Sequence, residues 1–303
     1  MSSSLIFNCI QIGLCFGIMA IGIHISFRTL GVPDLTIDGS FTLGAATSAI
    51  LCMYDLPVLG LILGLVAGNL AGIITGILHT KLKIQAVLAG ILTMTGLYSI
   101  NFWITKRRPS FTLYQNRTIF SILNDLKQVP FLGTNLKEVF TLLILLLITI
   151  LIIILLDRFF RTNIGLAIRA TGDNEDMVNA SSINTDAMKI IGFSISNAFV
   201  ALAGSLYVQL QSNYDNNYGN GMMVIGVAAI IIGEAIFKKR KLAKAYIISV
   251  LGAIIYEFIF MLALLIDNVN PIDIKIITAI IIILSVCLPM LYKKIKKGSK
   301  KDA

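Results

Sequence analysis

Long uninterrupted apolar runs dominate the chain. The longest, residues 139–156 (VFTLLILLLITILIIILL), contains no charged residue. A run of about 20 such residues crosses the hydrocarbon core of a bilayer as a helix. Because a bilayer accepts only helices or closed barrels, and these runs lack the alternation of barrel strands, the pattern predicts an all-α fold.

About nine apolar segments are candidate membrane spans, which predicts a polytopic helical bundle forming a single transmembrane domain over residues 1–303. Two of these segments are short for a full crossing, so we expect them to be tilted or broken part-way. The predicted spans are 5–27, 39–54 (short), 57–78, 84–105, 138–157, 187–211, 222–237 (short), 244–266 and 274–292.

Composition and charge agree with this picture. The chain is 56% hydrophobic and 14% charged, with a mean hydropathy of +0.86, whereas soluble domains carry roughly 25% charged residues. The net charge is +9, but the bases lie at the ends of apolar runs, where they orient a membrane protein rather than bind nucleic acid. The four cysteines lie in or beside apolar runs without close pairs, and the two histidines are isolated. We therefore expect buried thiols and no metal site.

The basic residues also predict an orientation. If the tail KKIKKGSKK is cytoplasmic, most Lys and Arg residues fall on the cytoplasmic side and the N-terminus lies outside. The 106–137 loop falls outside although it is basic, which is acceptable because long loops cross largely regardless of charge. The other predicted cytoplasmic segments are 79–83, 158–186 and 238–244, and the other outside segments are 212–220 and 267–273.

Glycine recurs every four residues in the third predicted span. This spacing places five glycines on one helix face, where a second backbone can approach closely. We expect them to serve helix packing. The five are Gly60, Gly64, Gly68, Gly72 and Gly76.

A polar segment interrupts the apolar pattern between the first two predicted spans. Pro33 cannot donate a backbone hydrogen bond, and glycines at positions 31 and 39 loosen the helix. A broken helix at membrane depth must face protein or water. We therefore predict that four polar residues of this segment line a translocation pathway: Asp34, Thr36, Asp38 and Ser40. The alternative is a simple cytoplasmic turn with a helix cap.

The 158–186 loop is the one long loop on the predicted cytoplasmic side. Asp173 is expected to cap a short helix whose apolar face contains Met177, Val178, Ala180 and Ile183. Such a helix suits docking into a groove on a soluble partner. A helix lying on the lipid surface is the alternative, disfavoured because its acids would meet a negative leaflet.

The stretch from Asn163 to Arg240 resembles the permease family that serves branched-chain amino acids, ribose and related solutes in ATP-binding-cassette (ABC) importers. Residues 165–174 (GLAIRATGDN) match the family pattern GxxxRAxGDN, and residues 203–206 (AGSL) match its AGxL element. Residues 34–40 (DLTIDGS) are similar to its DLSVGS motif, and GVPDLTIDGSF looks closest to a tryptophan- or tyrosine-uptake subgroup. The chain departs from the family at Ser181-Ser182, where Leu-Gly is usual, and at Glu234, where small residues are common.

The resemblance implies a Type II-like importer permease that is not an enzyme. Two copies would form a central pathway for a small solute, such as an aromatic amino acid, delivered by an extracellular binding protein in a bacterial cytoplasmic membrane. ATPase subunits would hold the ATP, because this chain has no G-x-x-x-x-G-K-[ST] phosphate loop. The residues expected to couple to them are Gly172, Asp173, Asn174, Glu175, Asp176 and Met177.

One acid inside a predicted span leaves a second function open. Glu257 lies within the eighth span, where a carboxylate is costly and often functional, so we add it to the predicted pathway. The alternative is that it pairs with Arg28, Lys244 or a hydroxyl group within a span. Together with Asp34 and Asp38 it would also suit a proton-coupled secondary transporter. Glu234, by contrast, is expected to pair with Lys238 at i+4.

Overall fold

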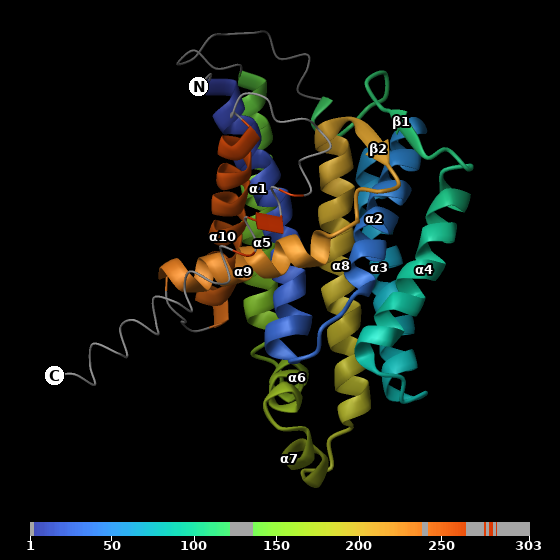
Figure 1. Cartoon of the computed structure of the whole chain (residues 1–303), viewed down its shortest axis with the longest axis vertical. Helices are drawn as coiled ribbons and strands as arrows, with labels where there is room; N and C mark the ends of the chain where they lie inside the picture. The colour runs from blue at the N-terminus through green and yellow to red at the C-terminus, as the bar shows by residue number, and fades with distance from the viewer. Residues whose placement is uncertain are drawn as a thin grey trace, which may run out of the picture.

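The computed structural model describes residues 3–121, 136–237 and 242–264, together with residues 276, 279, 280 and 283. Most of the described chain is helical (Figure 1). The elements are α1 (Ser3–His24), the π-helical turn η1 (Ile25–Thr29), α2 (Thr36–Met53), α3 (Pro57–Thr80), α4 (Ala86–Ile104), β1 (Ser110–Thr112), α5 (Leu136–Phe159), α6 (Asn163–Asp173), α7 (Glu175–Ala180), α8 (Thr185–Gln211), β2 (Asn213–Asp215), α9 (Met222–Phe237) and α10 (Leu242–Leu264).

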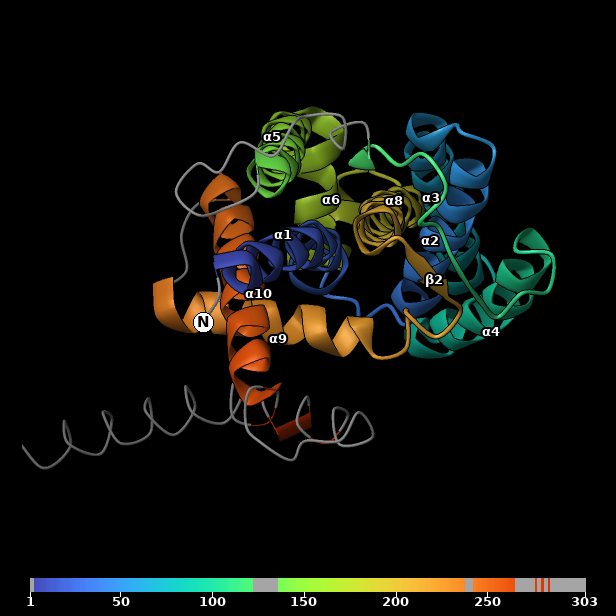
Figure 2. The same cartoon turned by 90° about the horizontal axis from the view of Figure 1, so that it is seen from above.

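Among the described residues, six helices are long and apolar enough to cross a membrane: α1 with η1, α3, α4, α5, α8 and α10. They correspond to six of the predicted spans, and the all-α polytopic bundle is confirmed. The two short segments differ. Helix α2 carries many hydroxyl side chains and is largely buried, and α9 has 16 residues and runs across the bundle (Figures 1 and 2). The predicted span 274–292 lies outside the described residues.

The two ends of the bundle differ. The start of α1 and the antiparallel pair β1–β2 lie at one end, and α6 and α7 project from the other (Figure 1). The 79–83 loop lies at the α6–α7 end, where Lys81 Nζ is 2.9 Å from Asp186 Oδ2. The 79–83 loop and the α6–α7 segment therefore share one end, and the β1–β2 loops share the other, as the order of the predicted spans required.

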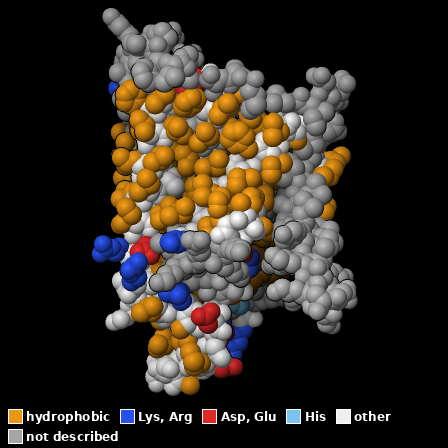
Figure 3. All heavy atoms as spheres, turned by 90° about the vertical axis from the view of Figure 1, so that its left-hand side faces the viewer, with side chains coloured by type: hydrophobic (Ala, Val, Ile, Leu, Met, Phe, Trp, Pro, Cys, Tyr) orange, Lys and Arg blue, Asp and Glu red, His pale blue; other side chains and the backbone are white. Residues whose placement is uncertain are grey.

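The lateral surface is apolar. Figure 3 shows a broad band of apolar side chains on one side of the bundle, with charged side chains gathered below it. On α5, Leu147 is 64% exposed, and at the end of α4 Trp103 is 71% exposed. Such a band matches hydrocarbon, and exposed aromatic residues at helix ends suit its interface with water.

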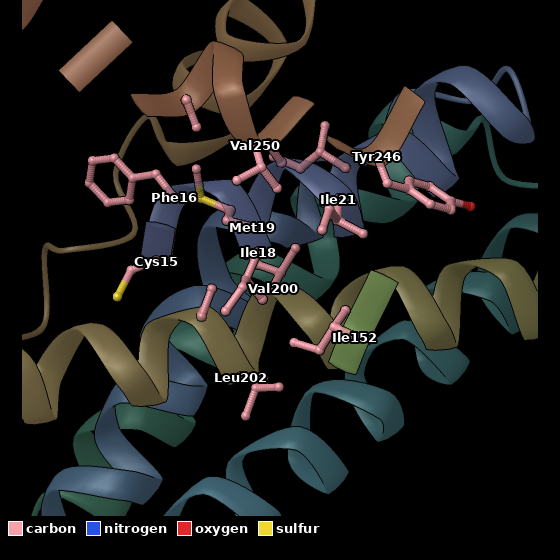
Figure 4. Close-up of a cluster of buried hydrophobic side chains, with 14 of the residues drawn as sticks. Cys15, Phe16, Ile18, Met19, Ile21, Ile152, Val200, Leu202, Tyr246 and Val250 are labelled. Atoms are coloured by element: carbon pink, nitrogen blue, oxygen red, sulfur yellow. The ribbon is translucent and has the colours of Figure 1, made fainter. Parts of the chain in front are cut away.

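Helix α1 forms the centre of the main apolar core (Figure 4). Its residues Ile18, Met19 and Ile21 are fully buried and belong to one cluster with Val200 of α8 and Tyr246 of α10. The cysteines of the described chain, Cys9, Cys15 and Cys52, are buried and unpaired, as expected.

The five glycines of α3 line its contact with neighbouring helices, which confirms the packing predicted from their spacing. All five are buried. A Cβ at Gly76 would lie 2.8 Å from the Cα of Ile190. At Gly64, Gly68 and Gly72 the added atom would meet α8 more closely still. The glycines therefore let α3 and α8 approach backbone to backbone.

Candidate translocation and coupling sites

The chain breaks between η1 and α2, as Pro33 and Gly31 predicted. The amide of Leu30 donates to the carbonyl of Ile25, and that of Val32 donates to Ser26, both at 3.0 Å. Gly31 then adopts a φ of +69°, which favours glycine. The backbone resumes as α2 at Thr36, so the polar residues that follow the break enter the bundle.

Asp34 lies at the centre of a hydrogen-bonded cluster between α2 and α8. Its Oδ1 accepts from the Thr36 amide at 2.9 Å, and its Oδ2 accepts from Asn197 Nδ2 at 2.7 Å. Asn197 Nδ2 also donates to the carbonyl of Phe193, and its Oδ1 accepts from Ser40 Oγ at 2.7 Å. Every polar atom of the Asn197 amide group is therefore used within the chain.

Thr36 extends this cluster to α3. Its Oγ1 lies 2.7 Å from Thr75 Oγ1, and both residues are fully buried. We call Asp34, Thr36, Ser40, Thr75 and Asn197 together the polar seam. Because its groups satisfy one another, the seam holds α2, α3 and α8 together without leaving a polar atom to apolar surroundings.

Asp38 has a different role from its neighbours. Its two carboxylate oxygens accept from the backbone amides of Gly221 and Met223, at 2.9 and 2.8 Å. These amides belong to the start of α9, where free N–H groups and the helix dipole favour an anion. Asp38 is partly exposed, so its side chain both caps α9 and remains accessible.

The two acids in the later helices also differ. Glu257 is 7% exposed and makes no hydrogen bond or ion pair with any residue that the structure describes. Glu234 of α9 pairs with Arg28 of η1. The expected partner Lys238 lies outside the described residues, and the pair with Arg28 instead joins α9 to the broken segment.

Three local caps shape the projecting helices. Thr162 caps α6, Asn174 caps α7 by accepting from the Met177 amide at 3.0 Å, and Asn184 caps α8. The expected cap Asp173 is instead the last residue of α6. The Asn174 side chain adopts the accepting role because the backbone there is extended, as a cap residue requires.

The α6–α7 projection is fastened to the bundle at two places. Lys189 Nζ of α8 lies 2.6 Å from Glu175 Oε1. At the end of α6, a Cβ on Gly172 would collide with the Thr29 carbonyl, so only glycine allows α6 to lie directly on η1. The α6–α7 projection therefore contacts both α8 and the broken segment directly.

The predicted coupling residues form one continuous stretch with different exposures. Asp173, Asn174, Asp176 and Met177 are exposed, whereas Gly172 and Glu175 are partly buried by the contacts above. Met177 is 57% exposed, and Val178, once expected on the same apolar face, is buried beneath it at 2%. The exposed apolar side chains of this region are thus Met177 and Ile183.

Sequence reasoning missed Asn197 and Thr75, because their partners lie far away along the chain. It also missed the α9 amides that Asp38 caps. A polar residue in an apolar run, such as Asn197 in the predicted span 187–211, was the available signal. Within the described residues, no group of His, Cys, Asp and Glu could hold a metal ion.

Comparison with known proteins gives a consistent result. Residues 5–292 match the family described as branched-chain amino acid transport system / permease component. The chain is 34% identical to a tyrosine transport system permease protein of Clostridioides difficile, covering 95% of this chain and 92% of that protein. It is 31% identical to an uncharacterized protein of Rickettsia prowazekii, with 88% and 91% covered.

A ribose import permease protein of Haemophilus influenzae is 27% identical over 71% of this chain and 64% of its own length. No solved structure matches the chain. The family match covers the whole described bundle, including the broken segment and the α6–α7 projection. The chain is a multi-pass membrane protein that belongs to the permease family of branched-chain amino acid transport systems.

Proposed function

We propose that this chain is the membrane-spanning permease subunit of an ABC importer that takes up an amino acid. The observation that carries the proposal is the α6–α7 projection: a capped helical pair outside the spanning bundle, fastened to η1 and α8. A secondary carrier needs no such platform. The family and the C. difficile relative support an amino acid as the solute.

The projection has the chemistry of a docking element. Met177 and Ile183 offer apolar contacts, and Asp173 and Asp176 surround them with negative charge. An ATPase with an apolar groove rimmed by bases would complement this surface. ATP would bind to that partner, and its closure would move α7 and hence η1 through Gly172.

The route of the solute stays a prediction. The residues expected to line it are Asp34, Thr36, Asp38, Ser40 and Glu257. In this proposal a passing solute reaches Asp38. Asp34, Thr36 and Ser40 would hold the wall of the route in place through the polar seam. Movement of η1 would shift Asp38 because α2 follows the break directly.

The remaining parts of the assembly follow from the same proposal. Two copies of the chain would enclose the pathway, an extracellular binding protein would deliver the solute, and the α6–α7 end would face the cytoplasm of a bacterial cell. Nine crossings would then include the region beyond α10.

Cysteine labelling tests this orientation. Ser110 of β1 and Asp173 of α6 are exposed at opposite ends of the bundle, whereas Asn216 is buried and unsuitable. The native cysteines in the described chain are buried, so they contribute little background labelling. In intact cells an impermeant thiol reagent should label Ser110→Cys and leave Asp173→Cys unmodified. The reverse pattern would place α6 and α7 outside and remove the docking proposal.

Co-purification tests the dock itself. Met177→Asp should reduce the amount of ATPase recovered with the permease about tenfold, because interface anchors of this kind contribute about 1–2 kcal/mol. Glu175→Lys should act similarly by repelling Lys189 and displacing α7. Leu82→Asp is the matched control, since Leu82 is 63% exposed at the same end but lies on another loop. Equal recovery in all four proteins would reject this dock.

A further inference from the structure

A polar cavity opens at the end of the bundle opposite α6 and α7. Its volume is about 460 Å³, within the range of small-molecule sites. Helices α1, α5 and α8 surround this end (Figure 2), and the segment after β1 completes the wall. The lining includes Gln11, Tyr114, Lys137, Glu138, Gln209 and Gln211.

Several lining groups are already used by the fold. Gln209 is 1% exposed, and its Nε2 donates to Ser48 Oγ and to the carbonyl of Pro57. Its Oε1 accepts from the Ile119 amide at 2.9 Å. Gln11 Nε2 donates to the backbone carbonyl of Glu138 at 2.9 Å. These contacts fix the wall, and they leave no role for the carboxylate of Glu138.

That carboxylate is the unexplained group. Within the described part of the chain, Glu138 Oε2 is buried without a hydrogen-bond partner, and Glu138 forms no ion pair there. A buried carboxylate oxygen without a donor is unfavourable, and native proteins rarely keep one unless something binds to it. Glu138 lines the polar cavity, so a cationic donor that enters the cavity can reach its carboxylate.

The positive charge of the neighbouring Lys137 limits which class of ligand the cavity suits. Lys137 lines the same cavity, is exposed, and likewise has no carboxylate partner among the described residues. A simple cation would be repelled by its ammonium group, whereas a zwitterion would complement both side chains. We propose that this cavity is a subsite for a free α-amino acid, whose ammonium group binds Glu138 and whose carboxylate binds Lys137.

This subsite rests on the proposed function and adds to it. It lies at the end where a binding protein would release the solute, and it is separate from the polar seam. The permease would then hold the amino acid itself before the pathway opens. Tyr114, which is 80% exposed at the rim, would cover the bound side chain.

Ligand binding to the purified full-length chain in detergent, without a binding protein, tests the subsite. The probes are L-tyrosine, L-leucine, tyramine, which lacks the carboxylate, and 3-(4-hydroxyphenyl)propionate, which lacks the ammonium group. At least one amino acid should raise the melting temperature of the native chain. Tyramine should raise it less, and the propionate should have no effect.

Substitutions at Glu138 and Lys137 test the role of each side chain in binding. Glu138→Gln should weaken amino-acid binding at least tenfold and Lys137→Gln several-fold, while Asp157→Asn, a carboxylate at the other end of α5 that pairs with Arg161, should bind like the native chain. Without ligand, Glu138→Gln should melt at or above the native temperature, because no partner is lost. Equal binding by native and Glu138→Gln proteins, no binding by either, or a clear loss of stability without ligand would overturn the subsite.

Uptake by the complete importer distinguishes this failure from that of the proposed function. Normal amino-acid uptake with Glu138→Gln would reject the subsite and leave the importer function standing. Uptake reduced in proportion to the loss of binding would support the subsite. No amino-acid uptake by the native importer would reject the proposed function, and the subsite with it.

Discussion

The polar seam and the polar cavity beside Glu138 each contain a carboxylate within the helical bundle, but the two carboxylates differ in their hydrogen bonding. Asp34 in the seam accepts two hydrogen bonds, from the Thr36 amide and from Asn197. Glu138 at the cavity keeps a buried oxygen without a donor among the described residues. The first carboxylate is an internal part of the fold, whereas the second is the one that a ligand would complete in our proposal.

This difference shows how polar groups in a membrane bundle can be sorted. An unsatisfied buried group costs about 1–3 kcal/mol, so a structural polar residue is expected to have partners. The seam meets that condition across three helices that the α3 glycines bring together. The cavity does not, and its unpaired charge is the feature that a ligand would stabilise.

Glycine substitutions should produce the largest effect on the seam side of this comparison. Gly68→Ala places a Cβ against Ala201 and the Asn197 carbonyl, so it should separate α3 from α8 and cost about 3 kcal/mol. Thermal unfolding in detergent measures the loss. Gly96→Ala is the control, because nothing lies within 4 Å of its added Cβ, and it should stabilise α4 by about 0.5–1 kcal/mol.

If the two alanine variants unfold alike, the close packing of α3 on α8 is not what holds the seam together, and the contrast with the cavity loses its basis.

Asp34→Asn should have the next largest effect. Whichever way the new amide turns, its NH2 group would face a donor, either Asn197 Nδ2 or the Thr36 amide, so the variant should lose about 2 kcal/mol of stability. Asn197→Asp, added to Asp34→Asn, should recover part of this loss by restoring one acceptor. The measurement is thermal unfolding beside transport per folded complex.

A different outcome would change the interpretation of Asp34. Normal stability with impaired transport would make Asp34 a group that meets the solute, as the sequence first suggested, rather than an internal partner.

Asp38→Asn should have a smaller and more local effect. Asparagine keeps one acceptor but replaces the other with a donor, and it removes the charge at the start of α9, which together should cost about 1 kcal/mol. Hydrogen exchange of the amides at residues 221–225 should accelerate, while exchange in α3 stays unchanged. Unaltered protection at these amides would mean that Asp38 does not hold α9 in place.

The sequence was sufficient for features that depend on local spacing. The glycine period identified the packing face of α3, Pro33 and Gly31 identified the broken helix, and the 165–174 motif identified the projection. Each is visible because its residues follow one another at short, regular spacing within one helix or one short loop.

Other features depend on residues distant along the chain. Asn197 meets Asp34 across 163 positions, and Asp38 reaches amides 183 and 185 positions away. The path of α9 across the bundle was not predictable either, because its apolar composition suits a short span equally well. The polar cavity beside Glu138 is lined by four segments that are distant along the chain, so no local sequence pattern reveals it.

The energy source of transport tests the central claim most directly. The permease, its ATPase and its binding protein should be reconstituted in liposomes and supplied with the amino acid. Accumulation should require ATP, should persist when the proton gradient is collapsed, and should fall with Met177→Asp but not with Leu82→Asp. Accumulation by the permease alone, driven by a proton gradient, would contradict the account and identify a proton-coupled secondary transporter.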